Sequence, residues 1–218
     1  MAQTHAHPQA GSFGGKLLRA FGEHLDDDVF HEVVRSDRID SVGLNPHRHG
    51  TVTDRGAGEL DEGQYDVQGV VFGISGALAL YRARALEDVR YGDEFFDQDF
   101  FAYKEDIDFA WRLQRALWDA LYVPEAVAYH YRGMYGPERS GLWQRLRHRQ
   151  EKSSLRNYLS TRNHWLMLFK NLTLTDVILR LPWLLVYEIG RLGYTLAFEN
   201  TGRRAFVEAI ALLPSMWK

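Results

Sequence analysis

The sequence predicts an α/β domain followed by a mostly helical C-terminal region. Apolar residues make up 45% of the 218 residues and charged residues 25%, a balance typical of soluble globular proteins. Between residues 67 and 133, short β-rich runs alternate with helical spacing, which is typical of α/β folds. Beyond residue 133, basic segments with helical spacing follow one another. We therefore expect two regions, 1–133 and 134–218.

The apolar runs of residues 1–133 predict the helices and strands of this region. Residues 45–66 are polar and carry four glycines, which predicts a long surface loop. A β-rich run over 67–72 stops at Gly73, and an apolar run over 77–81 resumes after Gly76. Residues 84–89 suit a short helix. Two strand candidates, 121–123 and 126–131, flank Pro124.

A helix over 107–117 carries the densest polar cluster of the chain at its start. Its apolar positions share one face, and Asp106 lies on that same stripe, directed toward the protein body. Asp108 lies four residues before Arg112, so we expect a surface pair there. An inward carboxylate at a helix start suits a general base. The alternative is a charged first turn, favoured by the helix dipole.

Metal-binding signals are weak. His130 closes a strand candidate, where a histidine is more often a core or edge residue, although neutral imidazole also suits divalent metals. Asp26–Asp28 and Asp97–Asp99 contain Asp-x-Asp patterns, which arise often by chance.

The chain has no cysteine, which excludes disulfides and thiolate sites and favours a reducing compartment. The first fifteen residues lack the features of a secretory signal.

Charge is distributed unevenly along the chain. Residues 131–218 hold 14 Lys and Arg against 6 Asp and Glu, whereas residues 1–130 hold 12 against 23. The basic tail either meets an anionic surface or docks on the acidic body. Its apolar runs, such as 165–169 and 181–187, fall short of the ~18–20 residues of a membrane span. Interfacial helices or an ordinary helical packing domain both fit this pattern.

Three segments in this order, residues 71–82, 95–112 and 122–130, resemble family 2 glycosyltransferases. The nearest branch is similar to the rhamnosyltransferase-like enzymes of bacterial cell-surface polysaccharide synthesis. The resemblance extends over residues 10–215 and includes 54–66 and 162–171. It implies a GT-A fold of which this chain holds the acceptor-side half, because the nucleotide-binding strands and their metal-binding Asp-x-Asp are missing. Leu117 departs from the pattern, since a helix-ending glycine is expected there. A left-handed cap would be strained for leucine, so we expect a rebuilt turn.

The resemblance also implies roles for particular residues. Asp106 would be the base that deprotonates the acceptor hydroxyl, with Glu105 beside it, and His130 would be a metal ligand. Positions matching the acceptor pocket are Gly76, Phe100 and Tyr103. A divalent metal, Mn²⁺ or Mg²⁺, would hold the diphosphate leaving group.

We therefore expect an inverting glycosyltransferase that moves a sugar such as rhamnose from a nucleotide-sugar to a cell-surface polysaccharide or lipid-linked acceptor. The isolated chain would be incomplete and would need a separate donor-binding half. The alternative is a non-catalytic membrane-peripheral module that binds a glycan or a partner. Either protein would be cytoplasmic and lie at the inner face of a bacterial inner membrane, on an anionic surface and without nucleic acid.

Overall fold

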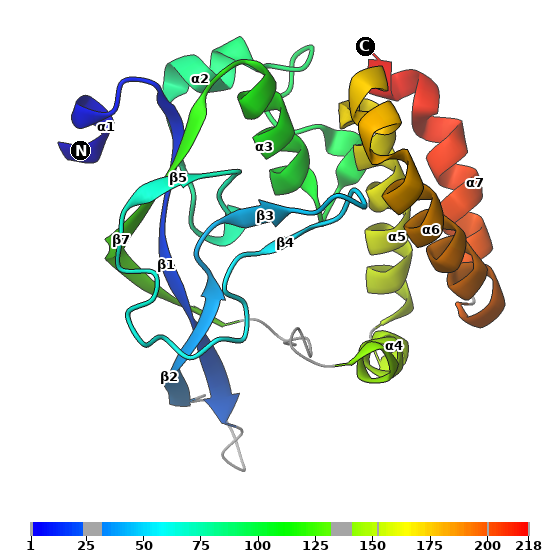
Figure 1. Ribbon diagram of the computed structural model, residues 1–218, viewed down its shortest axis with the longest axis horizontal. Coiled ribbons are helices and arrows are strands. Elements are labelled where there is room, and N and C mark those ends of the chain that lie inside the picture. The colour runs from blue at the N-terminus through cyan, green and yellow to red at the C-terminus, as the bar shows by residue number, and fades with distance from the viewer. Residues whose placement is uncertain (1, 24–31, 132–140, 152, 200, 218) are drawn as a thin grey trace.

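The computed structural model describes residues 2–23, 32–131, 141–151, 153–199 and 201–217, and it confirms the mixed α/β class. A twisted sheet with helices α2 and α3 occupies one side, and helices α4 to α7 form a group on the other (Figure 1). The strands are β1 (Ala10–Glu23), β2 (Glu32–Ser41), β3 (Leu44–Pro46), β4 (Val52–Asp54), β5 (Gly69–Val71), β6 (Leu80–Tyr81) and β7 (Asp119–Tyr131). The helices are α1 (Ala2–Ala6), α2 (Ala83–Asp88), α3 (Glu105–Arg115), α4 (Leu142–Glu151), α5 (Ser154–Asn171), α6 (Leu174–Phe198) and α7 (Gly202–Leu212).

The main sheet has the order β2-β1-β7-β5, and β6 pairs with the start of β1. Strand β1 runs parallel to β7 and antiparallel to β2 and β6. Strands β3 and β4 form a separate hairpin. The two strand candidates around Pro124 are one strand, since the β1–β7 ladder continues past an irregularity between Gly15 and Lys16.

Strand β1 is the central element of the sheet, and its glycines allow its neighbours to approach closely. A β-carbon on Gly14 would lie 2.2 Å from Ile74 Cγ2, and one on Gly15 would lie 1.8 Å from the carbonyl oxygen of Ala126. Lys16 is buried in this strand and is neutralised by Asp61, at 2.8 Å, and by Asp66. The segment 45–66, expected to be only a loop, therefore contributes the β3–β4 hairpin and a charge partner for the sheet.

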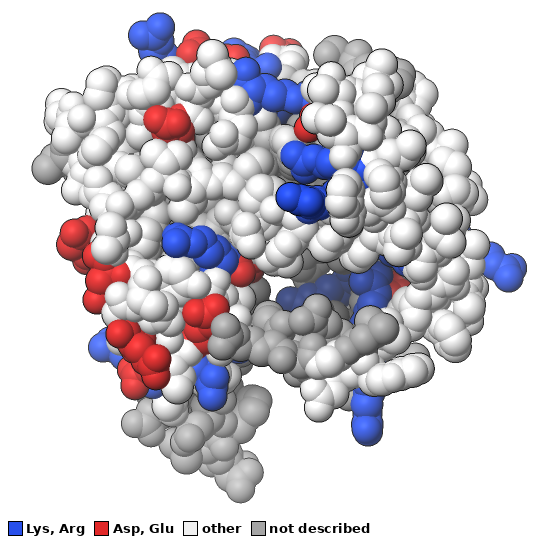
Figure 2. All heavy atoms as spheres, viewed as in Figure 1, with Lys and Arg blue, Asp and Glu red and all other residues white. Residues whose placement is uncertain are grey.

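Charge is separated over the surface. Figure 2 shows acidic side chains gathered on the sheet side, whereas the side formed by α6 and α7 is largely uncharged. Many basic side chains of the tail are already paired, for example Lys170 with Asp97 and Arg162 with Glu208. Within the described residues, no helix is both long and apolar enough to cross a membrane.

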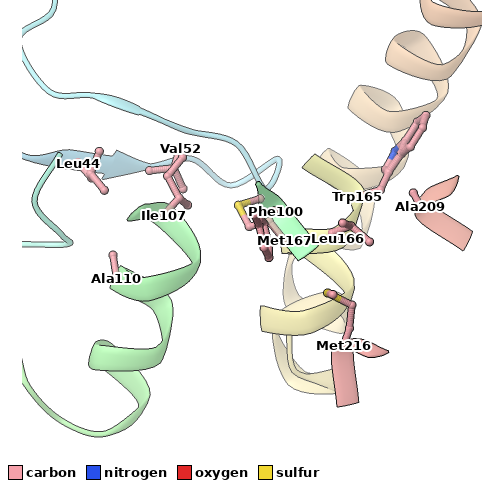
Figure 3. Packing of buried hydrophobic residues seen from close by; sticks show 10 residues of the cluster. All are labelled: Leu44, Val52, Phe100, Ile107, Ala110, Trp165, Leu166, Met167, Ala209 and Met216. Carbon is pink, nitrogen blue, oxygen red and sulfur yellow. The ribbon is translucent and has the colours of Figure 1, made fainter. Parts of the chain in front are cut away.

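The two regions share one hydrophobic core. Residues of the β3–β4 hairpin and of α3 meet residues of α5, α7 and the C-terminal turn (Figure 3). This packing makes the tail an integral part of the fold, as expected from apolar burial as the main stabilising term. The members are Leu44, Val52, Phe100, Ile107, Ala110, Trp165, Leu166, Met167, Ala209 and Met216.

Helix α3 ends in a left-handed cap at Leu117, where a rebuilt turn was expected. The turn is not rebuilt: Leu117 has φ +60°, and Trp118 N donates to Leu113 O at 3.0 Å in the manner of a Schellman cap. The leucine side chain is exposed, so it gains little from packing. The backbone strain is therefore largely uncompensated.

Replacing Leu117 with glycine should stabilise the protein by about 0.5–1 kcal/mol, since the left-handed strain of about 1–2 kcal/mol exceeds the added chain entropy of glycine. Chemical denaturation measures the change. Leu117→Ala is the control and should give no gain, because alanine meets the same strain. An equal gain from both variants would contradict the strain argument.

Candidate active site

The segment before α3 bends sharply and sets the start of that helix. Phe101, Tyr103 and Lys104 all have positive φ values, of 60°, 70° and 70°. Each such non-glycine residue costs about 1–2 kcal/mol of local strain. Such a bend persists only where surrounding contacts hold it. Glu105 and Asp106 follow directly, so the bend determines where their carboxylates lie.

Helix α5 holds this bend through two buried side chains. The amide nitrogen of Asn163 lies 2.8 Å from each of the carbonyl oxygens of Phe100, Ala102 and Tyr103. Arg162 donates to the carbonyl oxygen of Asp99 at 2.6 Å, and to Asn163 Oδ1 at 2.9 Å. Because Arg162 and Asn163 are themselves fixed on a helix, they form a rigid clamp on the bend. We call this pair the α5 clamp.

A buried ionic network supports the same region. Asp108 is fully buried and accepts hydrogen bonds from Arg112 at 3.0 Å, Lys170 at 3.1 Å and Asn171 at 2.8 Å. The pair with Arg112 predicted from the sequence is therefore present, but it is buried rather than on the surface. Lys170 also meets Asp97 at 2.6 Å. With its three donors, Asp108 has a structural role.

Asp106 has a different environment from Asp108. Its Oδ2 accepts the backbone N–H of Gly76 at 3.0 Å, and its Oδ1 lies 2.8 Å from its neighbour Ile107 N. The side chain is half-buried, and it makes no ion pair with any described residue. Gly76 has little room for a side chain, since a β-carbon there would lie 3.3 Å from Asp106 Cβ. The structure thus brings Gly76 and Asp106 together, as the resemblance implied.

Two further ionisable groups border Asp106. Burial raises the pKa of Glu105, and the charge of Asp106 raises it further. Burial, together with the charges of Asp106 and Glu105, raises the pKa of Tyr81, which therefore keeps its phenolic proton. Tyr81 also stacks edge-on against Phe109 and Phe96. Sequence reasoning did not select Tyr81, since nothing local links β6 to the start of α3.

The two aromatic candidates for the acceptor pocket lie in different places. Phe100 is 0% exposed and belongs to the shared hydrophobic core, so it contributes to packing and not to an open pocket. Tyr103 is 39% exposed, and the guanidinium of Arg156 lies 5.5 Å from its ring centre. Of the two, only Tyr103 is accessible to a substrate.

Mixed α/β architecture with a helical C-terminal region, and a half-buried carboxylate at a helix start, describe a GT-A-like domain. The family model for glycosyl transferase family group 2 matches residues 49–213, and the chain belongs to this family. Searches of curated proteins and of solved structures find no match. The matched segment contains Gly76, Asp106 and the α5 clamp, whereas strands β1 and β2 precede it.

Members of this family often use divalent metals, and His130 is the candidate ligand that the resemblance implies. His130 Nδ1 lies 2.7 Å from Asp40 Oδ2 on β2, and Asp40 is fully buried. None of the contacts between described residues joins His130 to Asp106. Among those residues there is also no group of three His, Asp or Glu side chains that could hold a metal ion, and Asp26–Asp28 lie outside them. The described residues therefore do not fit a metal site.

Replacing Asn163 with alanine should lower the free energy of unfolding by at least about 2 kcal/mol, since buried carbonyls without a donor each cost about 1–3 kcal/mol. Asn157→Ala is the control: Asn157 is also buried on α5, but it donates to only one carbonyl, that of Arg149. Denaturant unfolding of both variants tests this. Equal losses would show that the α5 clamp does not support the bend.

Proposed function

We propose that this chain carries the acceptor-activating side of an inverting glycosyltransferase, with Asp106 as general base. The family supports glycosyl transfer in general. The observation that supports the role of Asp106 is its coordination. One carboxylate oxygen is held by the backbone N–H of Gly76, while no cation among the described residues neutralises it. Such a carboxylate is fixed in direction and remains able to accept a proton.

The reaction follows from that geometry. The acceptor hydroxyl donates its proton to Asp106 as its oxygen bonds to the anomeric carbon of the donor sugar. The bond from that carbon to the diphosphate breaks on the opposite face, and the electron pair leaves with the diphosphate. Attack opposite the leaving group inverts the anomeric centre. Glu105 and Tyr81 lie beside Asp106, and burial raises the pKa of both groups.

The finer assignments are proposals as well. The donor is a nucleotide-sugar such as dTDP-rhamnose, and the acceptor is a cell-surface polysaccharide or a lipid-linked glycan. A donor-binding segment outside this chain completes the site, and a divalent metal bound there holds the diphosphate.

Titration of dTDP and Mn²⁺ into the isolated chain should then give no binding, and addition of a donor-binding half should restore it. A chain that never supports transfer with any donor half would instead be a binding module.

Asp106→Asn should reduce turnover by about 10²–10⁴-fold in the donor-complemented enzyme, the range attributed to a general base. Asparagine keeps an oxygen for the Gly76 N–H, so the fold and donor binding should be unchanged. The assay is release of nucleoside diphosphate, with donor affinity measured in parallel.

Asp93→Asn is the matched control, since Asp93 is a fully exposed carboxylate in the segment between α2 and α3. The turnover of this variant should equal that of the wild type. Wild-type turnover in Asp106→Asn would remove Asp106 from the mechanism. A parallel loss of donor affinity would indicate a binding role instead.

We also propose that helices α6 and α7 rest on an anionic membrane surface, in keeping with a cytoplasmic protein at the inner face of a bacterial inner membrane. Helix α6 reverses the pattern of an ordinary surface helix, in which the exposed residues are polar and the buried residues are apolar. From Ile178 to Phe198, every exposed residue of α6 is apolar, whereas its charged residues are partly buried. Helix α7 adds Val207 and Ile210, both exposed. This α6–α7 face is far more apolar than the surface of a typical monomer.

Charge around the α6–α7 face favours lipid as its occupant. Arg203 and Arg204 are exposed at the start of α7, and Trp183 is half-exposed within the face. Basic and aromatic residues that border an apolar stripe are typical of interfacial helices. The basic residues of α5 and α6 point inward. The exposed apolar area therefore contributes more to membrane binding than electrostatic attraction does, although the net charge of the tail suggested the opposite.

Substituting both Val186 and Ile189 with glutamate should reduce partitioning onto anionic vesicles by at least about tenfold, because burial of each side chain contributes about 1.5–3 kcal/mol. Vesicle co-sedimentation at low and high salt measures this, and wild-type binding should weaken only partly in high salt. Val67→Glu combined with Val70→Glu, on the exposed edge of the sheet, is the control and should bind like the wild type. Equal loss in both pairs, or no binding by the wild type, would contradict the proposal.

A further inference from the structure

Phe101 lies at the surface, although its neighbour Phe100 is in the core. Phe101 is 80% exposed, whereas Phe100 is 0% exposed and packs in the shared hydrophobic core (Figure 3). Tyr103 also borders the solvent, but the guanidinium of Arg156 lies 5.5 Å from its ring centre. The ring of Phe101 makes no aromatic or cation–π contact with any residue that the structure describes. An aromatic face without a partner is therefore exposed on the bend before α3.

The backbone at Phe101 is strained, and the exposed ring gains no packing in return. Phe101 has φ +60° and ψ −62°, and the N–H of Ala102 donates to the carbonyl oxygen of Phe100 at 2.6 Å. A hydrogen bond between residues i and i+2 at such angles makes a γ-turn of the rare, strained kind. Glycine would adopt these angles without the steric cost of a β-carbon. Strain of this kind clusters at sites that bind or react, so it points to a use for the ring.

The α5 clamp makes the exposed ring part of a rigid surface. The carbonyl oxygens of both flanking residues, Phe100 and Ala102, accept from Asn163 at 2.8 Å. Arg162 also donates to the carbonyl oxygen of Phe100, at 3.2 Å. The backbone that carries the ring is thus fixed before any ligand arrives. A ligand that covers such a preorganised side chain loses less free energy to ordering than one that must fix a loop.

Phe101 is also close to the candidate base along the chain. Asp106 follows five residues later, so the two α-carbons lie no more than about 18 Å apart. The γ-turn and the positive φ values at Tyr103 and Lys104 bend the intervening segment and shorten this span. A molecule of the length of a short oligosaccharide can therefore cover the ring and reach Asp106.

We propose that the ring of Phe101 is a stacking platform for a sugar ring of the acceptor and so helps to present a hydroxyl of the same molecule to Asp106. One face of a pyranose carries several C–H groups, which pack on the flat face of an aromatic side chain. This inference rests on the proposed role of Asp106 and adds a residue that positions the substrate. The resemblance pointed to Phe100, which is buried in the core, and did not select Phe101.

The size of the exposed group favours a sugar ring over a protein partner. A stable protein interface buries about 800 Å² on each side, which a single phenylalanine ring cannot supply. One sugar ring, by contrast, matches the area of one aromatic face. The ring of Phe101 would therefore add to the affinity for a small polar molecule that hydrogen bonds alone hold weakly in water.

Saturation-transfer NMR of the chain with methyl α-rhamnopyranoside, methyl α-glucopyranoside and sorbitol tests the proposal. Both methyl glycosides should receive saturation, most strongly at the C–H protons of one ring face. Sorbitol has similar hydroxyls but no ring, so it should receive little. Phe101→Ala should weaken glycoside binding by about tenfold, because a side chain of this size is no longer covered by the ligand. Phe101→Tyr keeps the aromatic face and should bind like the wild type.

Leu117 offers a matched control at the other end of α3, because it too is exposed and has φ +60°. Glycine relieves backbone strain at both positions, so neither Phe101→Gly nor Leu117→Gly should lower the thermal midpoint. Only Phe101→Gly should lose glycoside binding. A merely structural role for Phe101 would give the opposite result, a lower midpoint with unchanged binding.

The reaction gives a second readout. The methyl glycoside that binds better serves as acceptor in the donor-complemented enzyme. Phe101→Ala should raise the KM for this acceptor by about tenfold and change kcat little, since the stacking contact is the same in the ground state and the transition state. A fall in kcat with an unchanged KM would contradict a binding platform.

Several outcomes would overturn the proposal: no saturation transfer to either glycoside, equal affinity in Phe101→Ala, or equal transfer to sorbitol. A sedimentation coefficient that falls in Phe101→Ala would overturn it as well, because the ring would then contact a second copy of the chain. Asp106→Asn separates this inference from the proposed function, since it should retain glycoside binding while losing turnover. Retained turnover in Asp106→Asn would remove the base, and the NMR titration would still decide the role of Phe101.

Discussion

The geometry of the site depends on the α5 clamp, in which Arg162 and Asn163 hold the bend over residues 99–103. That bend has three non-glycine residues with positive φ, a conformation the free chain would abandon. Its carbonyls find donors on a helix that is itself packed in the core. Since α3 begins where the bend ends, the direction of Asp106 is fixed by side chains about sixty residues later in the sequence. The helical region is thus part of the site and not an appendage.

Local patterns predicted α3 and the pair of Asp108 with Arg112, because each depends on residues within a few positions of one another. Strand β1 was missed for a physical reason. It has glycines, Lys16 and Arg19 where a buried strand usually has β-branched residues, and Asp61, Asp66 and Asp40 help to neutralise those cations. Likewise, the roles of Asn163 and Tyr81 arise from contacts between distant segments, which no local spacing reports.

The excess of basic residues in the tail has a mixed explanation. Lys170 docks on the acidic body through Asp97 and Asp108, while Arg149 and Arg162 pair within the tail. What remains outward on α6 is apolar, and its charged residues, including Glu188 and Arg191, are partly buried. A helix with polar residues on its protein side and apolar residues on its outer side reverses the usual arrangement. This reversal gives one helix two different surfaces, a polar one against the protein and an apolar one that is exposed.

The parallel pairing of β1 with β7 also has a consequence for biosynthesis. These strands are joined in the centre of the sheet but lie more than a hundred residues apart in the chain. While a ribosome extends the polypeptide, β1 can pair with β2 and then with β6, and its other edge stays open until residue 131 emerges. Contacts of such long range slow folding and leave strand edges available for misassembly in the meantime. Productive folding therefore waits for β7 to close the sheet and then for the helical region, which shares the hydrophobic core.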